Sequence, residues 1–147
     1  MEKSKRMGPV VQVTESREEK AAREFGTCQR QLNEQQTQLE QLRGYYADYQ
    51  RQLEARGRAG IVLAQVLETQ RFLAQLEKAI AQQQQVVDQT ARLCAQKRNL
   101  WLAARTRSEA VNKVVERIVA QEQRRADKRE QKESDDLSQR KRREGLE

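Results

Sequence analysis

The sequence predicts an all-α fold, a long antiparallel two-helix coiled-coil hairpin whose second helix overhangs the first and ends in a frayed C-terminal tail. Three observations support this prediction. The composition favours helices over a compact core, with 36% hydrophobic residues, 35% charged residues and a single proline. Apolar residues recur at alternating intervals of three and four in each half of the chain. Gly57 and Gly60 separate the two halves.

The first helix is expected over about residues 10–55, after Pro9, and residues 1–9 are expected to be disordered. The alternation places apolar or aromatic side chains at every position but one in the series Phe25, Cys28, Leu32, Gln35, Leu39, Leu42, Tyr46, Tyr49 and Leu53. An average period of about 3.5 residues is typical of a left-handed coiled-coil seam.

A turn over residues 56–60 is expected to join this helix to a second one over residues 61–122, because glycine readily follows a helix C-terminus. The second helix keeps the same alternation through Val66, Thr69, Leu73, Leu76, Ile80, Gln83, Val87, Thr90, Cys94, Lys97, Trp101, Ala104, Ser108, Val111, Val115 and Ile118. Several of these positions are polar, so the seam is less apolar than that of a leucine zipper.

The turn also predicts which residues meet across the seam. A fold-back centred near Ala59 pairs residues whose numbers sum to about 118 or 119. Apolar then meets apolar and amide meets amide, as in Leu39 with Ile80, Gln35 with Gln83, Cys28 with Thr90, and Phe25 with Cys94. A parallel homodimer that uses the same stripes stays open as an alternative.

The two helices are unequal in length. The first helix, folded back, reaches to about residue 108 of the second, which leaves a short apolar set without an intramolecular partner: Val111, Val114, Val115, Ile118 and Val119. Such an uncovered stripe is a candidate for docking into another protein, with self-association and fraying as alternatives. Residues 123–147 are highly charged and are expected to form a frayed helix or a disordered tail.

Several classes of function are disfavoured. The chain has no histidine and no Gly-rich phosphate loop, so we expect neither an enzyme nor a bound cofactor or metal. Cys28 and Cys94 fit no metal-ligand spacing and are expected to stay unpaired. No apolar run approaches the roughly 20 residues of a membrane span, and the N-terminus does not read as a secretory signal. The net charge of +7 leaves a nucleic-acid-associated coiled coil or a generic basic scaffold as alternatives.

The aromatic residues are few and gather near the turn. Tyr46 and Tyr49 occupy seam positions, whereas Tyr45 and Phe72 lie beside the seam and are predicted to be neighbours on one edge. Tyrosine is enriched in protein-binding surfaces, so this edge is a candidate contact site. The alternative is that these side chains only widen a thin core.

Three segments give the chain a resemblance to the FliJ family of the bacterial flagellar type III export apparatus. They are "LRGYYADYQRQL" before the turn, "QRFLAQLEKAI" after it, and the basic segment "KRNLWLAARTRSEAV" that contains Trp101. The resemblance covers most of residues 10–120. It implies an antiparallel coiled coil that serves as a stalk without enzymatic activity.

The resemblance also implies partners. These are the hexameric flagellar export ATPase, the cytoplasmic domain of the export gate membrane protein, and export chaperones, with no nucleic acid and no direct membrane insertion. The implied location is cytoplasmic, peripheral to the inner membrane at the flagellar base. The family's gate-contacting surface falls here on Gln38, Leu42, Tyr45, Tyr49, Phe72, Leu76, Ala79 and Gln83.

The expected ATPase-binding region combines the basic segment with the overhanging helix. Residues 90–108 contain five basic side chains and no acidic one. We expect the basic side chains to meet acidic loops of the ATPase and the apolar ones to meet apolar collars of its central pore. The candidate residues are Arg92, Lys97, Arg98, Trp101, Arg105, Arg107, Val111, Val115 and Ile118.

Overall fold

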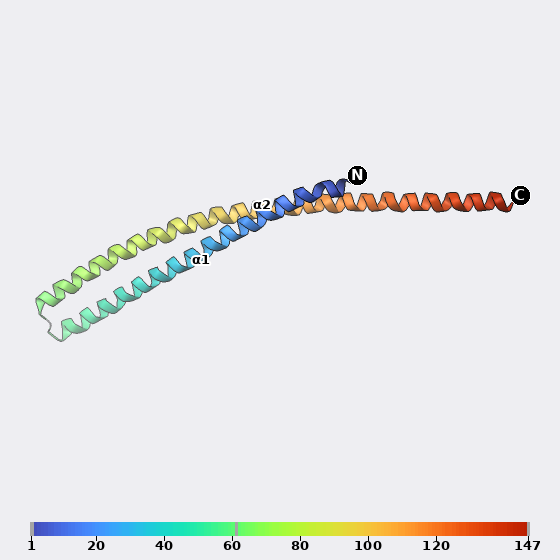
Figure 1. Ribbon diagram of the computed structural model, residues 1–147. Coiled ribbons are helices and arrows are strands. Elements are labelled where there is room, and N and C mark those ends of the chain that lie inside the picture. Colours follow the sequence, from blue (N-terminus) through green and yellow to red (C-terminus); the bar gives the residue numbers. More distant parts are fainter. Residues whose placement is uncertain (1, 61, 147) are drawn as a thin grey trace. The chain divides into compact units, whose positions relative to one another are not determined.

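The computed structural model describes residues 2–60 and 62–146, and it contains two helices within those ranges and no strand. Helix α1 spans Lys3–Arg58 and helix α2 spans Leu63–Gly145 (Figure 1). The all-α prediction and the helical hairpin are confirmed. The chain divides into two compact units, each described by itself: the turn unit, Ala21–Trp101, and the terminal unit, Met1–Lys20 with Leu102–Glu147.

The core of the turn unit is the predicted seam. Its buried side chains all come from the two heptad stripes: Cys28, Leu39, Leu73, Val87, Thr90 and Cys94. The positions between them on each stripe are mostly half-buried, and the outward faces of both helices are exposed. The three-four alternation therefore identified the packed face of each helix, because a helix of about 3.6 residues per turn returns to one face at that spacing.

The turn lies a little later than residues 56–60. Helix α1 continues through Gly57 to Arg58, and the Ala59 amide then donates to the Arg56 carbonyl at 3.0 Å. Gly60 has a φ of 79°, a left-handed conformation that glycine adopts without steric cost. The first residue of the predicted second helix, Ile61, lies outside the described residues, and α2 begins at Leu63.

The later turn shifts the register, and two of the predicted pairs are wrong, by about one helical turn at Cys28 and by about two at Phe25. Cys28 meets Cys94 instead of Thr90, and Phe25 packs on Trp101 instead of Cys94. When the centre of a turn moves by one residue, the partner opposite any given residue moves by two, because one arm becomes longer and the other shorter. Helix α1 ends at Arg58 and α2 begins at Leu63, so the turn is centred beyond Gly60 rather than at Ala59, which accounts for a shift of about one helical turn.

The terminal unit corrects a second expectation. Helix α1 begins at Lys3, so residues 3–9 are helical rather than disordered, and Met1 lies outside the described residues. The Ser4 amide donates to Glu122 Oε1 at 3.1 Å and the Ser4 hydroxyl donates to Glu122 Oε2 at 2.7 Å. Pro9 lies inside α1. It lacks an N–H to donate to the preceding turn, so α1 has one backbone hydrogen bond fewer there.

Because α1 extends this far, it covers part of α2 that was expected to be bare. Val111, Val115 and Ile118 are half-buried along the continued seam, whereas Val114 and Val119 are exposed. The uncovered part of α2 begins near residue 127, and every side chain from there to residue 146 is exposed. This tail is helical to Gly145. Glu147 lies outside the described residues, and the division into domains at residues 10 and 122 stays a prediction.

Candidate functional site

The turn unit has two long edges that flank the seam. We call the edge with Gln38, Tyr45, Phe72 and Ala79 the aromatic edge, and the edge with Arg43, Glu77 and Gln84 the polar edge. Both arise from heptad positions next to the seam, where side chains are partly packed and partly open to solvent. The two edges share one core and differ in chemistry.

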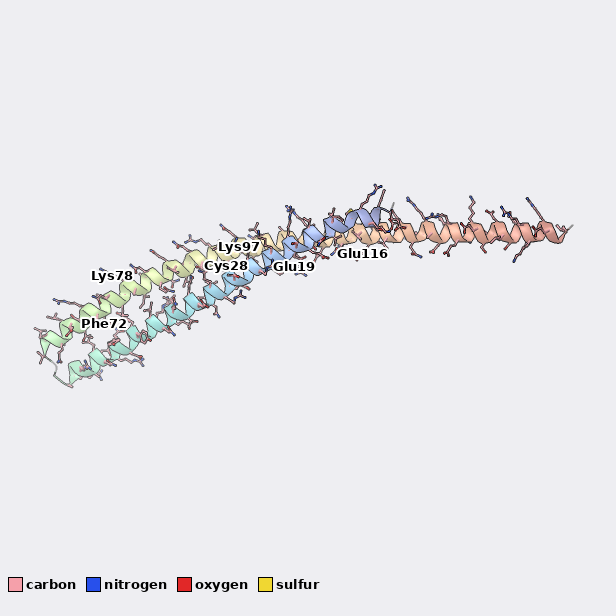
Figure 2. All side chains as sticks on the ribbon, in the orientation of Figure 1. Glu19, Cys28, Phe72, Lys78, Lys97 and Glu116 are labelled. Atoms are coloured by element: carbon pink, nitrogen blue, oxygen red, sulfur yellow. The ribbon has the colours of Figure 1, made fainter. Side chains whose placement is uncertain are left out.

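The aromatic edge carries the exposed rings. Phe72 lies near the turn (Figure 2) and its ring meets that of Tyr49 edge-on, with centroids 4.7 Å apart and planes at 65°. Tyr45 is 55% exposed, Phe72 39% and Tyr49 38%. The ring that packs on Phe72 is thus that of Tyr49 rather than Tyr45. An edge-on pair fixes the two rings while leaving apolar area open to a partner.

The remaining gate candidates continue this edge away from the turn. Gln83 donates to Gln38 Oε1 at 3.3 Å and to the Gln35 backbone carbonyl at 3.0 Å. The expected meeting of Gln35 with Gln83 therefore occurs, but through the backbone, and Gln35 Oε1 is buried without a hydrogen-bond partner among the described residues. Leu42, Leu76 and Ala79 are half-buried. The structure thus gathers the eight gate candidates on and beside one edge.

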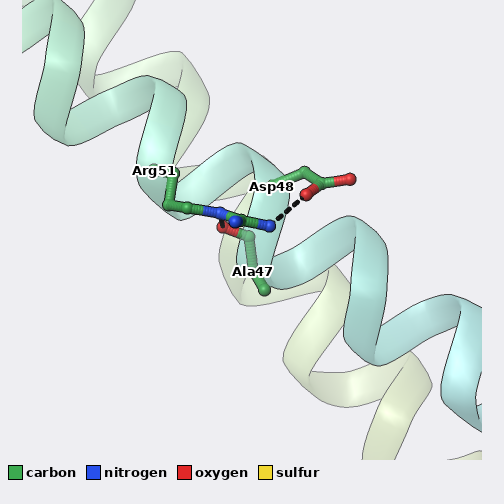
Figure 3. A network of polar contacts seen from close by, with 3 residues as sticks. All are labelled: Ala47, Asp48 and Arg51. Atoms are coloured by element: carbon green, nitrogen blue, oxygen red, sulfur yellow. Dashed lines mark hydrogen bonds and ion pairs between the residues drawn. The ribbon is translucent and has the colours of Figure 1, made fainter.

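Hydrogen bonds between side chains of α1 and α2 span the polar edge. The Tyr46 hydroxyl donates to Glu77 Oε1 at 2.8 Å, and Arg43 donates to Gln84 Oε1 at 2.8 Å. The hydrogen bond to Glu77 raises the pKa of Tyr46, with desolvation and the Glu77 charge as smaller causes. On the outer face of α1, Arg51 pairs with Asp48 and donates to the Ala47 carbonyl (Figure 3). Exposed pairs of this kind add little stability.

Two of the four ATPase candidates in the turn unit make contacts within the hairpin. Lys97 Nζ donates to Glu24 Oε2 at 3.2 Å across the seam. The Trp101 ring meets that of Phe25 with centroids 5.8 Å apart and planes at 71°. Arg92 and Arg98 are exposed. Glu24 and Phe25 were not predicted as partners because the expected register placed other residues opposite them.

The other ATPase candidates lie in the terminal unit. Arg105 pairs with Glu109 at 3.1 Å, one helical turn away, and Arg107 is exposed. Ser108 is 3% exposed, the lowest fraction among the buried residues of the chain's described part. Val111, Val115 and Ile118 are half-buried against α1, so a partner can use only part of their surface as they stand.

A groove of about 690 Å³ at the start of α1 was not predicted. It is lined by Glu2, Lys3, Lys5, Arg6, Ile118, Gln121, Glu122, Arg125, Ala126 and Arg129. Basic side chains outnumber acidic ones there. The Ser4 hydroxyl and then the Ser4 amide hold the pKa of Glu122 below its usual range. Sequence alone gave no signal for this groove, because residues 1–9 were not expected to be helical.

The two cysteines face each other across the seam of the turn unit and are free. Burial raises the pKa of Cys94 to about 11, and its hydrogen bond with Cys28 adds to the shift. Among the described residues, no group of three or more His, Cys, Asp or Glu side chains is placed to hold a metal ion. In the same part of the chain, neither helix is long and apolar enough to cross a membrane.

These features define a class of protein, the two-helix hairpins with partly exposed edges beside the seam. The family described as the flagellar FliJ protein matches residues 3–146, and the chain belongs to the FliJ family. It is therefore a component of the flagellar export apparatus. No curated protein and no solved structure matches the chain.

Proposed function

We propose that the chain is a non-enzymatic stalk of the export apparatus that links the hexameric export ATPase to the membrane export gate. The terminal unit binds the ATPase, the aromatic edge of the turn unit binds the cytoplasmic domain of the gate protein, and export chaperones are handled on the same hairpin. The stalk acts on the cytoplasmic side of the inner membrane, at the flagellar base. Family membership over nearly the whole chain, joined to the exposed Tyr45 and Phe72 rings, supports this role.

The gate surface is tested by the double variant Tyr45→Ala with Phe72→Ala. Aromatic anchors dominate binding energy in protein interfaces, so we expect affinity for the gate domain to fall by about tenfold or more. Both side chains are more than a third exposed, so the circular dichroism of the helices should change little. The matched control is Arg43→Ala with Leu67→Ala, two exposed positions off the aromatic edge.

Two results contradict this part of the proposal. One is unchanged affinity for the gate domain. The other is a loss of helicity as large as the loss of binding, which would mean that the two rings only widen the core.

The ATPase surface is tested by truncation. A chain ending at residue 129 keeps the part of α2 that α1 covers, whereas a chain ending at residue 108 lacks Val111, Val115 and Ile118. We expect the longer form to support hexamer formation and ATP hydrolysis like the full chain, and the shorter form to lose that effect. Equal stimulation by both forms contradicts the proposal. Helicity per residue, measured in parallel, separates lost contacts from unfolding.

A further inference from the structure

Helix α2 carries an apolar column beside the seam, most of whose members stay exposed in the hairpin. In the turn unit, five successive residues one heptad apart are all apolar: Phe72, Ala79, Val86, Leu93 and Leu100. Phe72 and Val86 are each 39% exposed, Leu93 is 43% exposed and Leu100 is 58% exposed. At 1.5 Å per residue the column is about 42 Å long. Only its first two members belong to the proposed gate surface.

The column lies beside the seam rather than in it. The α1 side chains along the same edge are mostly polar, with Gln38, Gln31 and Glu24 following Tyr45 at heptad spacing. A two-helix seam needs two apolar positions per heptad, whereas a third apolar position is typical of a helix that packs against more than one neighbour. Single exposed leucines such as Leu67 are ordinary, but five apolar residues in succession on one edge are not.

On α2, the positions that flank the column on its outer side are chemically uniform. The next position outward on α2 is glutamine in four successive heptads: Gln75, Gln82, Gln89 and Gln96. The position beyond that is basic or neutral and never acidic: Arg71, Lys78, Gln85, Arg92 and Asn99. A partner that covers the column would therefore meet amide groups first and positive charge at its outer flank.

We propose that Val86, Leu93 and Leu100 bind an amphipathic helix of another protein, which packs as a third helix and carries acidic residues on the flank that faces Lys78 and Arg92. The continuous heptad spacing fits the apolar stripe of a helix. The net charge of +7 favours an acidic partner over a second copy of this chain. The inference extends the aromatic edge beyond the gate surface and does not depend on which protein supplies the helix.

The test uses the full chain in flagellated cells, with the photo-crosslinking amino acid p-benzoylphenylalanine at Gln89, beside an intact column. We expect a crosslink that maps to an amphipathic helix with acidic residues next to its apolar stripe. Adding Leu93→Gln with Leu100→Gln should lower the yield about tenfold, because two anchor side chains are lost. Arg92→Glu should also lower it, whereas Leu67→Gln, an equally exposed apolar residue off the column, should not.

Several results would overturn the inference. They are a crosslink to a second copy of the chain, an equal yield from the same probe at Ala95 on another face of α2, no crosslink at Gln89, or a yield that the Leu93 and Leu100 changes leave unaltered. These outcomes are separate from the gate and ATPase tests, which use purified partners and other variants. Either proposal can therefore fail while the other stands.

Discussion

The heptad pattern runs through both units, but the seams differ in how much apolar surface they bury. In the turn unit the seam buries five apolar side chains, Cys28, Leu39, Leu73, Val87 and Cys94. In the terminal unit the one buried side chain among the described residues is Ser108, and the half-buried set mixes Ser4, Thr14, Glu18 and Glu122 with apolar side chains such as Val11, Val111, Val115 and Ile118. Apolar burial supplies about 25 cal/mol per Å², and polar burial supplies far less, so the turn unit is the stable part.

This difference bears on function. Segments with little apolar burial open locally at low free-energy cost, and regions that change on binding are drawn from them. The terminal unit holds Val111, Val115 and Ile118 half-buried under α1. In the function proposed above, local opening of this unit exposes them to the ATPase. The aromatic edge, in contrast, flanks the seam that buries the five apolar side chains, and its Tyr45 and Phe72 rings are already exposed.

The largest expected effect is on the turn-unit core. Leu39 is 5% exposed, and Leu39→Ala should lower the free energy of unfolding by about 2–3 kcal/mol through lost burial and a residual cavity. Val11→Ala, at a half-buried position of the terminal unit, should cost about 1 kcal/mol or less, since less apolar surface is removed from water there. Urea unfolding followed by circular dichroism measures both. Equal losses would remove the distinction between the two seams.

A smaller effect is expected at alkaline pH. The Cys94 pKa is raised from 9.0 to about 11, so the neutral buried thiol contributes stability that is fully present below pH 9 and is lost as pH rises through 11. Thermal unfolding of the wild type and of Cys94→Val between pH 8 and pH 11.5 isolates this contribution. The wild type should lose more stability than the variant over that range. Equal losses in the two proteins would contradict the raised pKa of Cys94.

The smallest expected effect concerns the start of α1. The pKa of Glu122 is held below its ordinary value of 4.5, so its bonds to Ser4 stabilise the terminal unit above that pH and are lost as pH falls through the lowered pKa. Glu122→Gln should speed amide exchange at Ser4 and its neighbours near pH 7 and leave exchange at Leu39 unchanged. Glu116→Gln, an exposed change on the same helix, is the control. Equal exchange in both variants would contradict a stabilising role for the hydrogen bonds between Ser4 and Glu122.

The sequence was sufficient to predict the packed faces and insufficient to predict the register. Heptad spacing identifies Leu39 and Leu73 as seam residues because side-chain direction depends only on position within one helix. The register depends on where the chain turns, and Gly57 and Gly60 both fit a helix end. Only the backbone shows that Gly60 takes the left-handed conformation. A shift of about one turn then replaces Thr90 by Cys94 opposite Cys28.

The site was predictable to the same degree. The aromatic edge follows from heptad position, and Tyr45 and Phe72 are exposed as a position beside the seam predicts, but the ring that meets Phe72 is that of Tyr49, which was predicted in the seam. The contacts of Lys97 with Glu24 and of Trp101 with Phe25 depend on the register and were missed. The contact of Ser4 with Glu122 was missed because Pro9 suggested that the helix begins after it, whereas α1 contains Pro9 and begins at Lys3.

The central claim is that one chain folds back on itself in the turn unit. The most direct test is an electron–electron distance between spin labels at Gln31 and Gln89, both exposed, in a chain with Cys28→Ala and Cys94→Ala. Dilution with unlabelled chain limits the signal to single molecules. Helices that pack side by side lie about 10 Å apart, so we predict a label separation below about 30 Å. A separation near 90 Å, which is the length of a continuous helix between these residues, would contradict the hairpin.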